Sequence, residues 1–118
     1  MSRGRPGDAV LFVYRLKPGM GPEYDRAHRA VWAEILDLID EAGIYDYQIW
    51  RRGDLVVSRM RTRHGYDHAR AVTGASAVQK RWTESLGHVF DEIADAEGEP
   101  LWLDEVFSHP VVGEGGSS

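Results

Sequence analysis

The sequence predicts a single α+β domain of the ferredoxin-like type, in which two helices cover one face of a four-stranded antiparallel sheet. The apolar pattern switches between strand spacing and helical spacing along the chain, which gives the order β-α-β-β-α-β. A short Gly-containing segment between the two middle strands is typical of a hairpin. The 118 residues suffice for one core and leave no room for a separate substrate domain.

The first strand and the first helix have clear boundaries. A β-rich apolar run, Ala9–Leu16, stops at a Lys-Pro-Gly segment. Residues 21–42 then read as one amphipathic helix, with Pro22 suited to its first turn and an apolar stripe roughly 120° wide. Gly43 follows at the position where helices commonly end with a left-handed residue. We therefore expect a strand followed by one long helix.

The middle of the chain predicts a hairpin. Two short strands, Ile44–Trp50 and Leu55–Met60, are separated by Arg-Arg-Gly-Asp, a loop whose length and glycine suit a hairpin. The next segment, Tyr66–Thr73, reads as helical and is interrupted by Gly74. The hairpin thus supplies the second and third strands of the sheet, and the segment after it begins the second helical layer.

A second amphipathic helix and a last strand complete the pattern. Apolar residues recur at helical spacing from Val78 through to Ile93, which predicts a helix over that stretch. A loop rich in Gly, Pro and acidic residues leads to the last strand, Leu101–Phe107. These two elements give the sheet its fourth strand and the helical layer its second member.

The predicted strands are apolar on both faces. In the first strand Val10, Phe12 and Tyr14 alternate with Leu11 and Val13, so neither face is polar. A sheet with one solvated face shows a cleaner alternation. The two helices cover one face only, and the sequence predicts no further element to cover the other. We therefore expect a homodimer in which two sheets pack face to face.

Composition narrows the function. A hydrophobic content of 42% and a charged content of 28% are typical of a soluble globular domain, which we expect over residues 9–110 with flexible tails at 1–8 and 111–118. The net charge of −5 and the lack of a basic stripe argue against nucleic acid. Because no apolar run suggests a membrane span or a signal peptide, we expect a cytoplasmic protein without membrane contacts.

The sequence gives little support for metal binding or for nucleophilic catalysis. The chain has no cysteine, and hence no disulfide, no thiolate nucleophile and no cysteine-based metal site. His64 and His68 have the i, i+4 spacing of helical metal ligands, but no third ligand is near, so we expect exposed residues and no metal. Neither a Gly-x-Ser-x-Gly elbow nor a GxGxxG loop is present.

His28 is the most informative residue. It projects near the middle of the apolar stripe of the first helix, one turn after Tyr24 and one turn before Trp32. A buried imidazole needs hydrogen bonds in place of water, so either the core satisfies this histidine or a pocket opens beside it. A histidine can give and take a proton near neutral pH, and the phenol at i−4 lies within reach. The pair suits proton transfer on a neutral polar molecule.

Two aromatic residues have packing as their default role. Trp82 lies in the apolar stripe of the second helix. Tyr47 alternates in its strand so that it shares one face with Tyr45 and Ile49, whereas Trp50 points to the other face. Aromatic faces also line sugar-binding and ring-binding sites, which is the alternative role for both residues.

Several motifs in order resemble one known family. They are Tyr-x-x-x-His-x-x-x-Trp-x-Glu, Ala-Gly-x-x-x-Tyr, Gln-x-x-Trp and Leu-x-Glu-Val-Phe. The residues that form them are Tyr24, His28, Trp32, Glu34, Ala42, Gly43, Tyr47, Gln79, Trp82 and Leu103 to Phe107. Over about residues 10–108 the chain resembles the L-rhamnose mutarotase family. The resemblance implies a dimeric α+β barrel that interconverts the α and β anomers of a 6-deoxy-hexose without a cofactor.

The resemblance also implies roles for five residues. His28 matches the family's catalytic proton donor, and we expect Tyr24 to act with it. Tyr24 and Tyr47 match tyrosines that contact the sugar, and Trp82 matches the second tryptophan of a pair that lines it. Arg81 stands where the family has the first tryptophan. An arginine brings charge and up to five hydrogen-bond donors, which would suit a substrate with a carboxylate or a keto group.

Three functions are consistent with these residues. The first is a sugar mutarotase, for which general acid–base help worth about 10²–10⁴-fold suffices because mutarotation also proceeds unaided. The second is a cofactor-free cyclase or isomerase of a non-sugar carbonyl compound in secondary metabolism, with Arg81 holding an oxyanion. The third is a non-catalytic dimeric binding protein in which His28 is a satisfied core residue.

Overall fold

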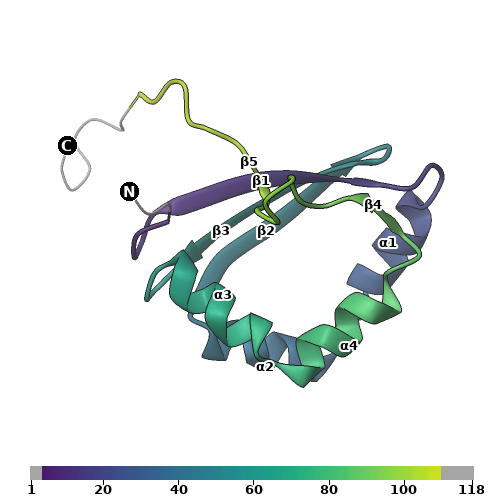
Figure 1. Ribbon diagram of the computed structural model, residues 1–118, viewed down its shortest axis with the longest axis horizontal. Coiled ribbons are helices and arrows are strands. Elements are labelled where there is room, and N and C mark those ends of the chain that lie inside the picture. Colours follow the sequence, from purple (N-terminus) through teal and green to yellow (C-terminus); the bar gives the residue numbers. More distant parts are fainter. Residues whose placement is uncertain (1–3, 110–118) are drawn as a thin grey trace.

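A computed structural model describes residues 4–109 of the chain. A mixed sheet-and-helix domain results, with the four helices on one face of an antiparallel sheet (Figure 1). The elements follow one another in the order β1 (Ala9–Leu16), α1 (Gly21–His28), α2 (Ala33–Glu41), β2 (Ile44–Arg52), β3 (Leu55–Thr62), α3 (Tyr66–Gly74), α4 (Ala77–Ser85), β4 (Phe90–Glu92) and β5 (Leu101–Trp102). This arrangement confirms the predicted ferredoxin-like α+β fold.

The sheet is built around β1. Its strand order is β2-β3-β1-β4, with β5 also paired to β1, and this is the order of a ferredoxin-like sheet. β1 and β3 pair from Ala9 opposite Arg61 to Arg15 opposite Leu55. β4 pairs with the C-terminal end of β1, whereas β5 pairs with its middle. Two short pieces therefore fill the position of the fourth strand.

The predicted helix over residues 21–42 is broken into two helices, so the expectation of one continuous helix is wrong. α1 ends at His28 and α2 begins at Ala33. The intervening residues include neither Gly nor Pro. Trp32 has an extended backbone (ψ 138°), and its ring meets that of Trp82 edge to face at 5.1 Å between centroids. This contact between Trp32 and α4 thus overrides the helical pattern of the sequence.

The second predicted amphipathic helix ends earlier than predicted. A break follows Gly74 as expected, and the Ser76 hydroxyl caps α4 by accepting a backbone hydrogen bond (3.2 Å). α4 ends at Ser85, so the predicted continuation of the helix to Ile93 is wrong. The chain turns there because Phe90 pairs with β1 as the start of β4, and a sheet partner is not visible in a local periodicity.

The first three strands agree with the prediction, but the last predicted strand does not. β1 has its predicted bounds, and the hairpin strands are slightly longer than predicted. The predicted strand Leu101–Phe107 is wrong beyond Trp102. Leu103 still donates a hydrogen bond to the Leu11 carbonyl (2.8 Å), but the edge of β1 ends soon afterwards, and Val106 and Phe107 are exposed. An alternating pattern gives a strand only where a partner edge exists.

Two core clusters lie between the sheet and the helices. The α1-side core consists of Leu16, Tyr24, Val56, Leu86 and Val89. The α3-side core consists of Val10, Ala42, Ile44, Met60 and Ala69. We call the sheet face that carries both clusters the inner face, and the opposite one the outer face.

The segment before β1 is hydrogen-bonded to the domain. The backbone of Gly7 donates to Thr62, and that of Tyr66 donates to Gly4, so residues 4–8 of the predicted N-terminal tail are hydrogen-bonded to the domain. The predicted tail at 111–118 lies outside the described residues. Between residues 4 and 109 no helix is long and apolar enough to cross a membrane.

Candidate active site

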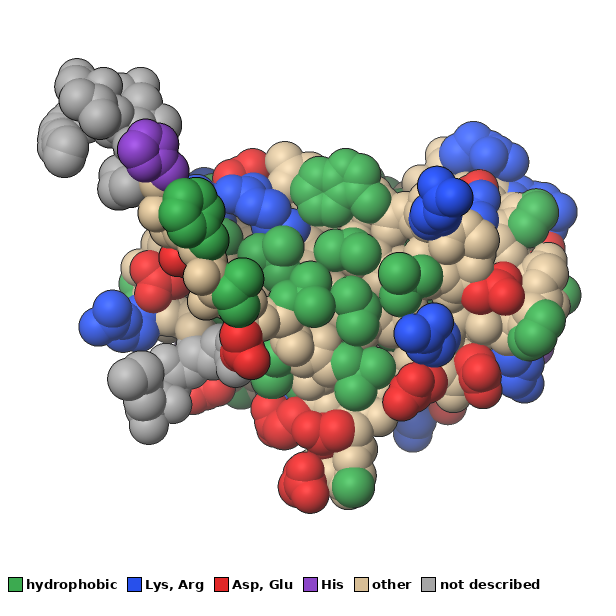
Figure 2. Space-filling view, turned by 90° about the horizontal axis from the view of Figure 1, so that it is seen from above, with side chains coloured by type: hydrophobic (Ala, Val, Ile, Leu, Met, Phe, Trp, Pro, Cys, Tyr) green, Lys and Arg blue, Asp and Glu red, His purple; other side chains and the backbone are tan. Residues whose placement is uncertain are grey.

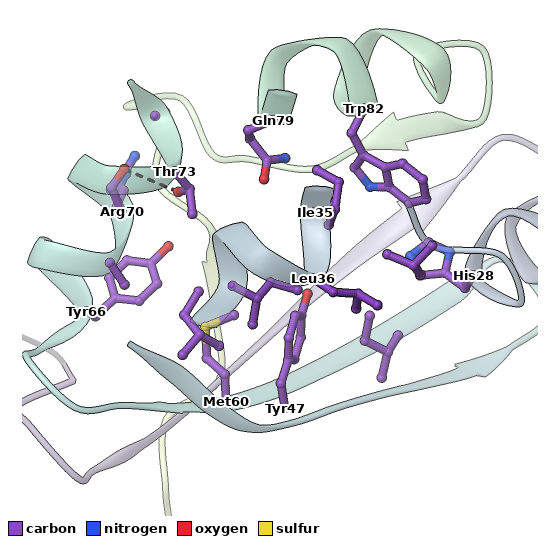
Figure 3. Close-up of a pocket in the computed structure, with 16 residues that line it drawn as sticks. His28, Ile35, Leu36, Tyr47, Met60, Tyr66, Arg70, Thr73, Gln79 and Trp82 are labelled. Carbon is purple, nitrogen blue, oxygen red and sulfur yellow. Dashed lines mark hydrogen bonds between the residues drawn. The ribbon is translucent and has the colours of Figure 1, made fainter. Parts of the chain in front are cut away.

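A cavity of about 450 Å³ lies between the helices and the inner face of the sheet. Figure 3 shows His28 and Trp82 at one end, Tyr66 and Arg70 at the other, and Tyr47 between them. This volume is in the range of small-molecule sites, about 300–1,000 Å³. The remaining side chains that line this central cavity are Val31, Ile35, Leu36, Ile39, Ile44, Ile49, Met60, Ala69, Thr73 and Gln79, with Gly74 beside them.

His28 is held by a backbone carbonyl. Its Nδ1 lies 2.9 Å from the carbonyl oxygen of Tyr24, one turn earlier in α1. A carbonyl oxygen can only accept a hydrogen bond, so Nδ1 carries the proton of the neutral ring. Nε2 is then left with a lone pair, able to accept a proton and to return it. The orientation of the ring is fixed before any ligand binds.

Tyr24 supports His28 from behind and does not line the central cavity. Its ring stacks on the imidazole at 4.0 Å between centroids, and the side chain is buried. Its hydroxyl is hydrogen-bonded to that of Tyr14. Burial raises the pKa of Tyr24 to about 12 and raises the pKa of Tyr14 as well. Tyr24 therefore stays protonated near neutral pH, with its hydroxyl directed to another tyrosine.

One indole contacts the imidazole, and a second indole packs against the first. Trp82 meets the His28 ring edge to face at 5.8 Å, and Trp32 in turn meets Trp82 at 5.1 Å. Trp82 lines the cavity. The second indole next to it comes from the break between α1 and α2, not from position 81 of α4. This contact depends on the helix break, which the sequence pattern did not predict.

Tyr47 reaches the cavity because of a bulge in β2. The register between β2 and β3 shifts between Tyr45 and Gln48, and Asp46 has a left-handed backbone (φ 51°). Asp46 accepts hydrogen bonds from Arg59 and Arg61, each at 3.1 Å. These contacts hold the bulge from the outer face.

The bulge corrects one prediction about this strand. Tyr45 pairs with Arg61 of the outer row of β3, and Arg63 lies over its ring at 4.4 Å. Tyr47 and Ile49 both line the cavity. The expectation that Tyr47 shares a face with Tyr45 is therefore wrong, because the extra residue of a bulge changes the alternation of side chains.

An ion pair fixes α1 against the sheet. Arg51 of β2 donates from Nε and Nη2 to the two carboxylate oxygens of Asp25, at 2.8 and 2.5 Å. The hydrogen bond from Arg51 lowers the pKa of Asp25. Gly21 permits this approach, because a Cβ there would collide with the Arg51 guanidinium. The bidentate geometry restrains the helix that carries His28.

Arg81 lies outside the cavity. Its side chain is 56% exposed, and its nearest ionic partner is Glu34 of α2 at 3.9 Å. The residue is a neighbour of Trp82 in sequence, but it does not belong to the cavity lining. The structure thus brings together His28, Tyr47 and Trp82, places Tyr24 behind His28, and leaves Arg81 at the surface.

Three polar residues of α3 line the cavity and were not predicted. Tyr66, Arg70 and Thr73 follow one another at i, i+4 and i+7, the spacing of a single helix face. That spacing was present in the sequence as a signal. These residues were not predicted because helical spacing alone does not show which face of α3 meets the preceding helices.

The histidine pair at the start of α3 has no ligand set around it. His64 and His68 are exposed and their rings lie 5.2 Å apart, edge to face. Among residues 4–109 no group of three or more His, Cys, Asp or Glu side chains could hold a metal ion.

The geometry suits proton transfer on a small ring compound. An oriented imidazole stands at one end of a cavity whose wall is mostly aromatic and aliphatic. Such a wall excludes water and strengthens the few polar contacts that the ligand makes. A ligand with one reacting end could place it at His28 and its remaining atoms along the cavity.

Comparison with known sequences gives one family. A family model described as L-rhamnose mutarotase matches residues 9–109. An L-rhamnose mutarotase of Sinorhizobium fredii is 34% identical over 85% of this chain and 96% of its own length. Another, of Phocaeicola vulgatus, is 27% identical over 81% of this chain and 92% of its own length.

Solved structures show the same fold. The crystal structure of an L-rhamnose mutarotase from Formosa agariphila has a TM-score of 0.68 and 18% identity, covering 87% of this chain and 99% of its own. Tetracenomycin F2 cyclase from Streptomyces glaucescens, a type II polyketide cyclase, has a TM-score of 0.61 and 16% identity, covering 88% and 98%. One fold thus carries two chemistries, and the distinction depends on side chains.

Proposed function

Because this chain belongs to the L-rhamnose mutarotase family, we propose that its central cavity interconverts the α and β anomers of an L-rhamnose-like 6-deoxy-hexose, with His28 moving the proton. The chain is accordingly an isomerase. The observation that carries the mechanism is the Nδ1 contact of His28 with the Tyr24 carbonyl, at 2.9 Å, which leaves Nε2 for the ligand. The reaction changes no oxidation state and needs no redox cofactor.

The proposed reaction is a reversible ring opening. The C1–O5 bond breaks, O5 takes a proton from the Nε2–H of protonated His28, and the C1 hydroxyl gives its proton to water. The open-chain aldehyde turns about the C1–C2 bond. O5 then attacks the other face of C1 and returns its proton to Nε2, while the C1 carbonyl oxygen takes a proton back from water. The imidazolium, which forms when the free Nε2 takes a proton from solvent, is thereby regenerated, as general acid–base catalysis requires.

The other cavity residues have binding roles in this proposal. The Trp82 indole offers a flat apolar face for the C–H side of the sugar ring. The Tyr47 hydroxyl offers a hydrogen bond to a sugar hydroxyl. Tyr24 acts through His28, because its carbonyl holds Nδ1 and its ring stacks on the imidazole. We propose it as a positioning residue for the proton donor.

Anomer exchange on L-rhamnose, measured by saturation-transfer NMR, tests the proposal. His28→Asn should lower the catalysed rate about 10²-fold or more, since an amide cannot cycle a proton near pH 7. His88→Asn is a matched control, because that histidine is 59% exposed and lies outside the cavity. Circular dichroism should show both variants folded. Wild-type exchange in folded His28→Asn would disprove the assignment.

We also propose a homodimer that buries the outer face of the sheet. Figure 2 shows apolar side chains gathered on that face. Trp50 is 52% exposed there, and Leu103 is 41% exposed. Exposed apolar patches of this kind mark interaction surfaces. The two-sided alternation of β1 gives the face its composition, so a second copy offers a matching surface.

Light scattering tests the dimer. The wild type at micromolar concentration should have about twice the 13.3 kDa mass of the chain. Trp50→Asp should shift the protein toward the monomer, because a carboxylate buried without a partner opposes the contact. A monomeric wild type would contradict the proposal.

A further inference from the structure

We propose that the α3 end of the central cavity is a second subsite, which takes an apolar group attached to the sugar opposite its anomeric carbon. The preferred substrate is then a reducing 6-deoxy-hexose with a hydrocarbon or acyl substituent. This inference rests on the proposed function, because it places the anomeric carbon at His28.

The cavity is larger than a single sugar needs. At the roughly 30 Å³ that one water takes in the liquid, its 450 Å³ holds about fifteen waters. A 6-deoxy-hexose has fewer non-hydrogen atoms than that, and they are bonded closer together than separate waters. A sugar placed against His28 and Trp82 therefore leaves the end near Tyr66 unfilled (Figure 3).

The wall between the two ends is aliphatic. It consists of Ile35, Leu36, Ile39, Ile44 and Met60. A sugar hydroxyl facing this wall would lose its water and gain no partner, which costs binding energy. An alkyl group there would instead bury apolar area on both sides. Leu36 has 51% of its surface exposed although it lines the cavity, so the wall has apolar surface to offer.

Two of the polar side chains at the α3 end, those of Arg70 and Thr73, are already engaged within the protein. Arg70 donates from Nη1 to Glu99 at 2.8 Å and from Nη2 to the Gly98 carbonyl at 3.1 Å. The Thr73 hydroxyl donates to the Arg70 carbonyl at 3.3 Å. With its charge balanced by Glu99, Arg70 does not favour an anionic ligand. This end therefore favours an apolar substituent over a carboxylate or a phosphate.

Ring geometry determines where the substituent is attached. In a pyranose, C4 lies across the ring from C1. When C1 and O5 meet His28 and the ring lies against Trp82, O4 is directed along the cavity toward α3. A group on O4 then passes Leu36 and reaches Tyr66 and Thr73. A substituent on the ring carbon next to C1 would not be directed along the cavity toward α3.

Gly74 provides a variant that blocks the subsite. It lines the cavity at the C-terminal end of α3, and a Cβ built there meets nothing within 4 Å. A phenylalanine at this position can occupy the α3 end without displacing the core. Ala71→Phe is the matched control, because Ala71 lies on the same helix, is exposed and does not line the cavity.

The experiment compares L-rhamnose with 4-O-butyl-L-rhamnose, a stable ether that still mutarotates. Each buried methylene is worth about fourfold in binding, so the wild type should have at least about tenfold higher kcat/KM for the ether. Gly74→Phe should remove this preference by lowering exchange of the ether more strongly than that of L-rhamnose. Ala71→Phe should behave as the wild type with both sugars.

Two results would overturn the subsite: equal kcat/KM of the wild type for both sugars, or a Gly74→Phe variant that treats them as the wild type does. Failure of the proposed function gives a different result, namely no catalysed exchange of either sugar. In that case calorimetric binding of the ether to wild type and Gly74→Phe still decides on the subsite. Binding that Gly74→Phe abolishes supports it, and binding unchanged by Gly74→Phe refutes it.

Discussion

The α1-side and α3-side cores share one sheet but are packed differently. On the α1 side the ring of Tyr14 meets those of Tyr24 and Phe90 at 6.1 and 5.7 Å, so large aromatic side chains fill the space. On the α3 side Trp102 meets Phe12 and Tyr66 at 5.7 and 4.9 Å, but the small side chain of Ala69 lines the cavity and leaves it open. The comparison shows that the packed α1 side restrains His28, whereas the α3 side has the space that the proposed ligand needs.

Truncation of one buried side chain in each core should give the largest difference in unfolding free energy between the two sides. Leu86 and Met60 are similarly buried, at 4% and 6% exposure, but Met60 also lines the cavity. Leu86→Ala should lower the free energy of unfolding by about 4 kcal/mol, and Met60→Ala by about 2 kcal/mol, because Met60 already lacks neighbours on one side. Urea denaturation followed by fluorescence measures both. Equal losses would mean that the two cores are equally packed.

Alkaline pH should destabilise the protein through its buried tyrosines, among them Tyr24 on the α1 side. Burial raises the pKa of Tyr24 from 10.0 to about 12, so the folded state favours the neutral phenol. Its contribution is complete below pH 10 and is lost as the pH rises toward 12, which removes about 2–3 kcal/mol of unfolding free energy. Urea denaturation at several pH values measures this loss.

Tyr24→Phe serves as the control for the alkaline experiment. This variant lacks the titrating hydroxyl but keeps the ring that stacks on His28. Its unfolding free energy should start lower, because the hydrogen bond to Tyr14 is gone, and should fall less between pH 10 and 12. A parallel decline in both proteins would assign the alkaline loss to other groups.

Replacing Arg81 should have the smallest effect, because it belongs to neither core. With its side chain 56% exposed and Glu34 at 3.9 Å, Arg81→Ala should change stability by no more than about half a kcal/mol. Exchange of L-rhamnose should stay unchanged. A clear change in substrate preference would return Arg81 to the binding site, in a conformation other than the one described.

Local patterns predicted the elements of the fold but not their interruptions. The bounds of β1 and the left-handed Gly43 (φ 78°) agree with the prediction because strand alternation and helix ends are encoded nearby in sequence. The break before Ala33 could not be predicted in this way, since it depends on contact between Trp32 and Trp82. The early end of α4 likewise depends on a partner strand that is distant in sequence.

The candidate site was predictable to a similar extent. A histidine in the apolar stripe left two interpretations open, a satisfied core residue or a residue beside a pocket, and His28 lines a pocket. Which residues stand behind it was not predictable, because Tyr14 reaches Tyr24 only through the packing of β1 against α1. The resemblance drew attention to Arg81, whose neighbour Trp82 turns inward while Arg81 does not. Sequence adjacency on a helix separates side chains by about 100°, enough to place one of two neighbours outside.

The central position of β1 has a consequence for how the chain is made. β1 precedes every other strand, yet it pairs with β3, β4 and β5. The partner of its Phe12 is Trp102, which lies near the far end of the described chain. The β2–β3 hairpin can form within microseconds, whereas such distant pairings are slow. During synthesis β1 emerges with two apolar faces and two unpaired edges, the features that promote aggregation. The strand that holds the finished sheet together is the one that a growing chain must protect longest.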